Sequence, residues 1–81
     1  MSALDIKTHV NGHCVSTVAL RVEHSWGGAD GGYWFETYIF PSDGEKITEW
    51  LEEWGTRYRT ETEAREGHAH TVALVEAGTL P

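Results

Sequence analysis

Residues 57–75 read RYRTETEAREGHAHTVALV, and this stretch decides the fold that we expect. It begins as extended chain and becomes a helix after Thr60, because Thr60 and Glu63 have the spacing of a capping box, which satisfies two free amides of the first turn. On a helical wheel, residues 61–76 place small and apolar side chains on one arc: Ala64, Gly67, His68, Thr71, Val72, Leu74 and Val75. The sequence therefore predicts an amphipathic helix whose contact face lies close against a sheet.

His68 falls in the middle of this expected contact face, with Gly67 beside it. We interpret His68 as a buried histidine whose ring nitrogens bind neighbouring backbone, and Gly67 as the residue that permits close packing. His68 and His70 are two residues apart, so on a helix they point to different sides and do not share a metal ion. Thr60, Glu63, Gly67 and His68 are therefore expected to be structural.

The N-terminal part predicts a β-hairpin. Residues 4–10 alternate apolar and polar side chains, Asn11-Gly12 is a strong turn signal, and the even positions of 14–26 again carry most of the apolar side chains. A two-residue loop would pair Val10 with His13, whereas a three-residue loop would pair Val10 with Cys14. The second pairing gathers more apolar side chains on one face, so we expect the longer loop, with a bulge.

A glycine-rich connector, 27–32, leads to the aromatic strand YWFETYIF, 33–40. Its pairing with 14–26 stays open, because Trp26 could lie opposite Trp34, which sets His24 beside Glu36, or opposite Tyr33. Both faces of this strand are apolar, and a helix covers only one of them. We expect Trp34, Tyr38 and Phe40 to form a surface for self-association or for a partner protein.

Residues 43–54 predict a second, short helix. A Ser-x-x-Glu box at Ser42 and Glu45 precedes Ile47, Trp50, Leu51 and Trp54, which follow the i, i+3, i+4, i+7 spacing of one helical face. Gly55 stands where a helix C-cap would, and 56–59 returns as a strand.

Three short motifs resemble a group of small proteins encoded by actinobacteria-infecting phages. They are Glu36-Thr37-x-x-Phe40, then Gly44-Glu45-x-Ile47-Thr48-Glu49-Trp50, then Arg57-Tyr58-x-Thr60-x-x-Glu63-Ala64-x-x-Gly67-His68. Members of the group typically read ETMVF, GEVTDW and ERYDTEEEAxxGH. The resemblance implies a phage-encoded protein in the host cytoplasm, with no established activity. It also implies an extended run where the periodicity predicts the 43–54 helix, which we retain as the expectation.

Composition narrows the classes of partner. The 81 residues carry a net charge of −7 with six scattered basic residues, which argues against nucleic-acid or anionic-membrane binding. Cys14 is the single cysteine, and neither a signal peptide nor a membrane-spanning run is visible. We expect a cytoplasmic protein without cofactor or metal ion.

The sequence thus predicts one α+β domain over 1–81, an antiparallel sheet of three to four strands with the C-terminal helix on one face. The expected function is a non-enzymatic protein-interaction module that forms a homo-oligomer, in the setting of a phage accessory protein acting on a host component. The alternative is a small metal-binding or catalytic protein that uses His68, His24 and Glu36.

Overall fold

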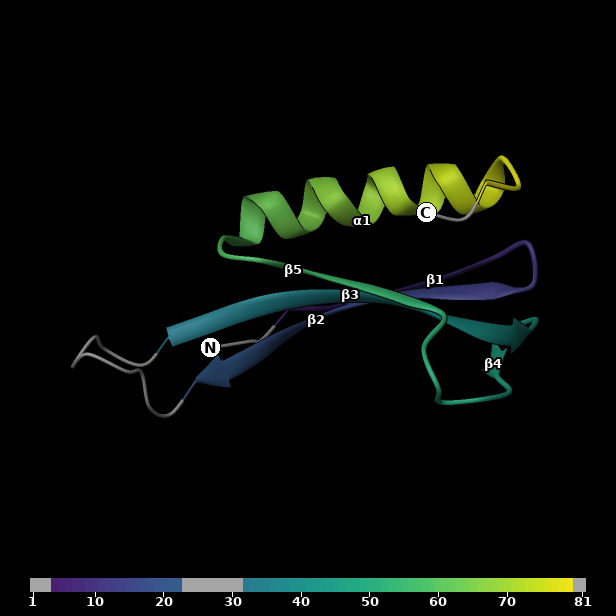
Figure 1. The fold of residues 1–81 in the computed structure, drawn as a ribbon, viewed down its shortest axis with the longest axis horizontal. Coiled ribbons are helices and arrows are strands. Elements are labelled where there is room, and N and C mark those ends of the chain that lie inside the picture. Colours follow the sequence, from purple (N-terminus) through teal and green to yellow (C-terminus); the bar gives the residue numbers. More distant parts are fainter. Residues whose placement is uncertain (1–3, 23–31, 80–81) are drawn as a thin grey trace.

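The protein folds as a five-stranded antiparallel sheet with one helix across it. The computed structural model describes residues 4–22 and 32–79. Its elements are β1 (Asp5–Val10), β2 (His13–Val22), β3 (Gly32–Asp43), β4 (Lys46–Ile47), β5 (Trp54–Tyr58) and α1 (Glu61–Glu76). β2 lies between β1 and β3, and the other edge of β3 pairs with both β4 and β5. Helix α1 crosses one face of this sheet (Figure 1), which confirms the expected α+β class.

The β1–β2 hairpin has the two-residue loop, so the expected three-residue loop with a bulge is wrong. Val10 pairs with His13, and Asn11 and Gly12 both have positive φ, at 54° and 80°. Such a turn matches the twist of the flanking strands, which is why Asn-Gly favours it. Apolar matching fails as a criterion here because β2 is buried on both faces: Cys14 and Val15 are both fully buried.

The β2–β3 register aligns Val18 with Glu36 and Leu20 with Trp34. Neither pairing considered for Trp26 therefore occurs in the described part of the sheet, since Trp34 and Tyr33 both have other partners. Trp26, His24 and the connector residues 27–31 lie outside the described residues.

The predicted helix at 43–54 is wrong, because the chain there forms a turn, the short strand β4 and a loop. Gly44, at φ 63°, turns β3 into β4, and residues 48–53 then leave the sheet as a loop on the side away from α1 (Figure 1). The helical spacing misleads because the apolar residues of this segment pack on opposite faces of the sheet. Trp54 packs in a cluster with Ile39 and Val75 under the helix, whereas Trp50 packs edge-on against Phe40, with ring centroids 5.2 Å apart.

Helix α1 begins as predicted. The Thr60 side chain accepts from the Glu63 amide at 3.1 Å, and the Glu63 side chain accepts from the Thr60 amide at 3.2 Å, which confirms the capping box. Two apolar clusters hold the helix to the sheet, one around Leu4, Phe35 and Ala64 and the other around Val15, Ile39 and Val75. Among the described residues, no helix is long and apolar enough to cross a membrane.

Gly67 permits a close contact, as expected, and its partner is Tyr58 of β5. A Cβ placed on Gly67 would lie 2.2 Å from the Tyr58 hydroxyl, so the tyrosine ring occupies the space that any larger residue would need. The same relation recurs on the other side of the sheet. A Cβ on Gly55 would lie 2.7 Å from two ring carbons of Tyr38. Gly55 is therefore a β5 residue against which the Tyr38 ring packs, and it is not the helix C-cap that the sequence predicts.

Candidate interaction surface

The sheet face turned away from α1, which we name the far face, carries the aromatic residues singled out in the sequence. Phe35 and Ile39 pack in the clusters under the helix, so the alternate residues of β3 point the other way. The pairings extend this face across the sheet. Its main members are Cys14, Ser16, Val18 and Leu20 of β2, Trp34, Glu36, Tyr38 and Phe40 of β3, and Gly55 and Arg57 of β5.

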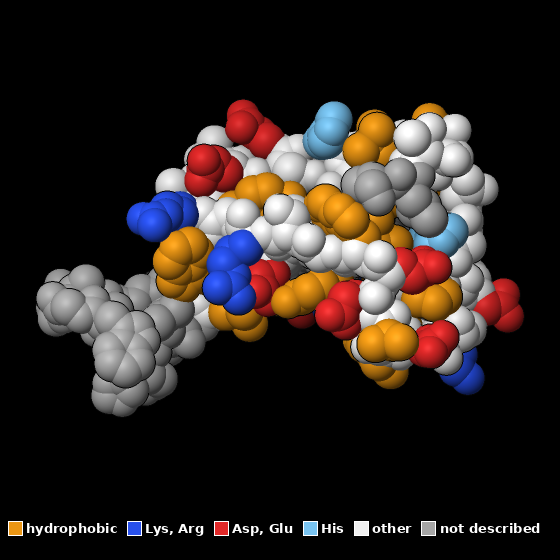
Figure 2. All heavy atoms as spheres, in the orientation of Figure 1, with side chains coloured by type: hydrophobic (Ala, Val, Ile, Leu, Met, Phe, Trp, Pro, Cys, Tyr) orange, Lys and Arg blue, Asp and Glu red, His pale blue; other side chains and the backbone are white. Residues whose placement is uncertain are grey.

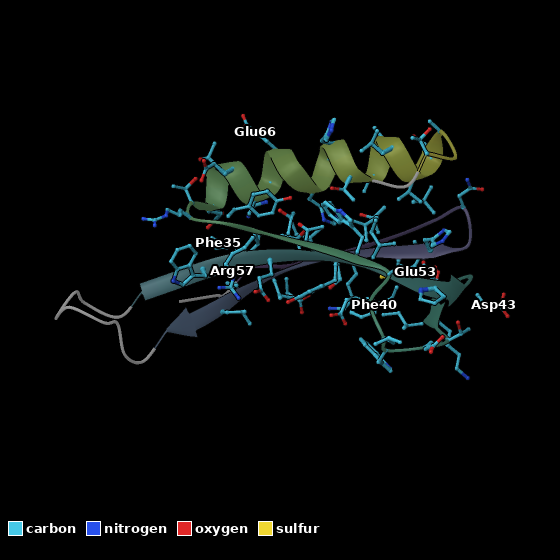
Figure 3. The ribbon with its side chains drawn as sticks, viewed as in Figure 1. Phe35, Phe40, Asp43, Glu53, Arg57 and Glu66 are labelled. Carbon is cyan, nitrogen blue, oxygen red and sulfur yellow. The ribbon has the colours of Figure 1, made fainter. Side chains whose placement is uncertain are left out.

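The three predicted surface residues differ in how much they can contact a partner. Trp34 and Tyr38 are half-buried, but Phe40 is only 8% exposed because Trp50 covers it. Figure 3 shows Phe40 on the side of the sheet away from the helix, next to the 48–53 loop. Phe40 therefore supports the loop and contributes little exposed surface of its own.

Sequence reasoning missed the most exposed apolar residues. Trp50 is 68% exposed, Leu51 is 70% exposed, and Leu20, at the opposite end of the far face, is 39% exposed. The helix predicted at 43–54 places Trp50 and Leu51 on its apolar face. Without the expected helix, the adjacent Trp50 and Leu51 would indicate a pair of exposed apolar side chains that could contact a partner.

At the Leu20 end of the far face, two arginines stack on Trp34. The Cζ atoms of Arg57 and Arg59 lie 5.7 Å and 4.9 Å from the centroid of the indole ring. The ring's negative π face attracts both cations. In a chain with only six basic residues, this places two of them at one end of one face.

Glu36 fixes the middle of the far face. Its buried carboxylate accepts hydrogen bonds from Arg57 through Oε2, with Nε at 2.8 Å, and from the Tyr38 hydroxyl through Oε1. The bond to Glu36 holds the phenol in its neutral, donating form and, with burial, raises the pKa of Tyr38. A buried carboxylate is tolerable here because both of its oxygens have donors.

A pocket of about 360 Å³ opens beside this carboxylate, between β5 and the 48–53 loop. It is lined by Glu36, Tyr38, Glu52, Gly55, Thr56 and Arg57. The far face is thus hollow between the Trp34 end and the loop rather than flat.

His68 lies on the other side of the sheet, in the contact between helix and strands. Its Nδ1 lies 2.6 Å from Thr17 Oγ1 and its Nε2 lies 2.8 Å from Thr8 Oγ1, and Thr17 Oγ1 lies 2.6 Å from Thr37 Oγ1. The expected backbone partners are therefore wrong, because threonine hydroxyls of β1 and β2 take that place. Burial lowers the pKa of His68, which favours the neutral ring.

The alternative His/Glu cluster is not assembled. His68 faces the helix side of the sheet and Glu36 the far face, so the sheet separates them; His24 lies outside the described residues. Across residues 4–22 and 32–79, no three His, Cys, Asp or Glu side chains gather as metal ligands would.

Charge is divided along the far face. Arg59 lies at the Trp34 end, with Arg57 beside it paired to Glu36. The β3–β4 turn and the 48–53 loop instead carry one lysine, Lys46, and five acidic residues: Asp43, Glu45, Glu49, Glu52 and Glu53. Figure 2 shows basic side chains on the left of the molecule near mid-height and mostly acidic ones around the apolar side chains toward the lower right.

Comparison with protein-family models, with curated proteins and with solved structures gives no match to this chain.

Proposed function

We propose that this protein is a non-enzymatic protein-interaction module that works through the far face. The observation that carries the proposal is the exposure of Trp50 and Leu51, side by side on a loop that the helix does not cover. Exposing two large apolar side chains to water costs free energy that contact with a partner would recover. Tryptophan is also enriched among the residues that dominate binding energy in interfaces.

The proposed setting is that of a phage accessory protein acting on a host component in the host cytoplasm, with the far face also mediating self-association. The setting rests on the three sequence motifs that resemble actinobacteriophage proteins. Trp34, Tyr38, Trp50 and Leu51 are the side chains that would touch a partner, and Phe40 would hold the loop in place from behind.

A pull-down from actinobacterial host lysate tests this proposal with three versions of the bait. These are the wild type, Trp50→Glu and the control Ala69→Glu. Trp50→Glu places a charge in the exposed anchor, whereas Ala69→Glu adds the same charge at an exposed position of α1. Circular dichroism checks that all three baits have the same fold.

We expect host proteins that bind the wild type and Ala69→Glu but not Trp50→Glu. Recovery of the same proteins by all three baits, or of none by any, would overturn the host-interaction proposal.

A further inference from the structure

We propose that the far face binds a second copy of this chain in a reciprocal, face-to-face dimer, in which the 48–53 loop of each copy occupies the Trp34 end of the other. This inference rests on the proposed interaction function and names the partner of the same surface. The required two-fold axis lies in the plane of the sheet and runs at right angles to the strands. It brings the two far faces together, lays β5 over β5 and sets each loop against the opposite end.

Shape and apolar contacts favour this arrangement. The loop projects from one end of the far face (Figure 1). The surface beside it is hollowed by the pocket along β5. A two-fold axis of this kind sets each loop against the Leu20 end of the other copy. Trp50 and Leu51 of one copy then contact Leu20 and Trp34 of the other, which joins the exposed apolar side chains of the two ends.

Charge selects this axis over the other in-plane choice. An axis parallel to the strands would bring the two arginine-bearing ends together and the two acidic loops together at the other end, and like charges held close together repel. The axis across the strands instead sets Arg59, which stacks on Trp34, against the loop that carries Glu49 and Glu52. Because each chain has a net charge of −7, two copies repel one another overall, so a dimer requires such local complementarity.

The size of the face is adequate. Four strands spaced ~4.8 Å apart, with ~3.4 Å per residue, give a sheet surface on the order of 500 Å² before the loop is added. A standard interface buries about 800 Å² per partner. The exposed side chains of the loop, above all Trp50 and Leu51, would add to this area.

Sedimentation velocity from low to high micromolar concentration, with charge reversals at the two ends, tests the dimer. Arg59→Glu and Glu52→Arg should each weaken the dimer by about tenfold or more, because each places like charges at both reciprocal contacts. An equimolar mixture of the two variants should form a heterodimer of near wild-type affinity, since one contact is then native and the other is reversed. The double variant should recover the homodimer, and Ala69→Glu should leave it unchanged.

A wild type with the mass of one chain at every concentration overturns the dimer, while the pull-down can still support a host partner. A dimer that persists in Trp50→Glu overturns the proposed surface. A dimer weakened by each single reversal but not restored in the mixture overturns the reciprocal arrangement. Conversely, a dimer with full recovery, combined with an empty pull-down, supports the inference and removes the host component from the proposed function.

Discussion

His68 joins the helix to two strands through side chains alone. Thr8 and Thr17 bind its two ring nitrogens, and Thr37 continues the chain of hydroxyls into β3. A neutral imidazole has one N–H donor and one acceptor nitrogen, and threonine hydroxyls can supply either role, so both tautomers are satisfied. The buried polar side chains between the two apolar clusters therefore have partners, which limits what their burial costs.

The histidine should make stability depend on pH. In the unfolded chain the ring titrates near its ordinary pKa of about 6.5, and burial lowers the pKa of His68 in the folded protein. As the pH falls below about 6.5, the unfolded chain therefore binds a proton at this histidine more readily than the folded protein does. The free energy of unfolding then decreases as the pH decreases, until the pH reaches the folded-state pKa. We expect the urea midpoint to drop between about pH 7.5 and about pH 5.

His68→Gln, which keeps a donor and an acceptor but does not titrate in this range, should show a smaller drop. His70→Gln, an exposed position on the same helix, should behave as the wild type. Equal drops in the wild type and His68→Gln would contradict the burial of a neutral ring.

The location of His68 was predictable from the sequence, but its partners were not. A helical wheel places residue 68 on the contact face whatever the strands do. The threonines meet beneath it only because β1, β2 and β3 are aligned in one register, and the hairpin register depended on a turn that apolar matching assigned wrongly.

Gly67 should resist replacement although it sits inside a helix. Alanine has the better helix propensity by about 1 kcal/mol, but its Cβ would meet the Tyr58 ring. We expect Gly67→Ala to lower the free energy of unfolding in the wild type. In a Tyr58→Leu background, where the ring is gone, the same change should raise it. Urea unfolding of the four proteins measures this coupling, and a Gly67→Ala protein more stable than the wild type would contradict the contact.

Among the elements, α1 depends on the cap at its first turn. Thr60→Ala removes the acceptor for the Glu63 amide and should cost about 1 kcal/mol. For a domain of this size that loss lowers Tm by about 4–8 °C. Thr62→Ala is the matched control, because Thr62 is exposed and lies inside the helix rather than at its cap. Thermal denaturation should show the drop for Thr60→Ala alone; equal drops would place the start of the helix elsewhere.

The elements also differ in how far the sequence specified them. The capping box and the amphipathic pattern both depend only on residues in or next to α1, so the sequence predicts where this helix begins and ends. The 48–53 loop is set by tertiary contacts, since Trp50 rests on Phe40 and Trp54 lies under the helix. Helical spacing reports only that apolar side chains recur, and in this segment they recur because the chain passes from one face of the sheet to the other.

On the scale of the whole molecule, the two faces of the sheet are covered unequally. The helix spans all four long strands on one side, whereas the loop covers the Phe40 end on the other. The alternation of side chains along β3 predicts from the sequence that Trp34, Tyr38 and Phe40 share one face. The exposure of Trp50 and Leu51 and the separation of basic from acidic residues could not be predicted, because both depend on the position of the 48–53 loop.

Trp50 should report the state of the far face in solution. Its 68% exposure makes it accessible to a dissolved fluorescence quencher such as acrylamide when the chain is alone. If two copies meet through this face, quenching should increase on dilution as dimers dissociate. The difference between the wild type and Trp50→Phe isolates this residue from the other three tryptophans. Quenching of Trp50 that does not change with concentration would contradict burial of the loop between copies.

The pairing of His68 with threonines also decides where the helix stops along the sheet. Apart from Gly67 against Tyr58, the contact face of α1 is built mainly from small residues, which fix its position along the sheet less sharply. A shift of one helical turn, about 5.4 Å, would carry the imidazole away from both hydroxyls, so that Thr17 would keep only its contact with Thr37 and the half-buried Thr8 would lose its imidazole partner. The imidazole of His68 therefore helps to fix the position of α1 along the sheet. With leucine at position 68, we expect several helix positions of similar energy, visible as multiple NMR signals for each α1 amide.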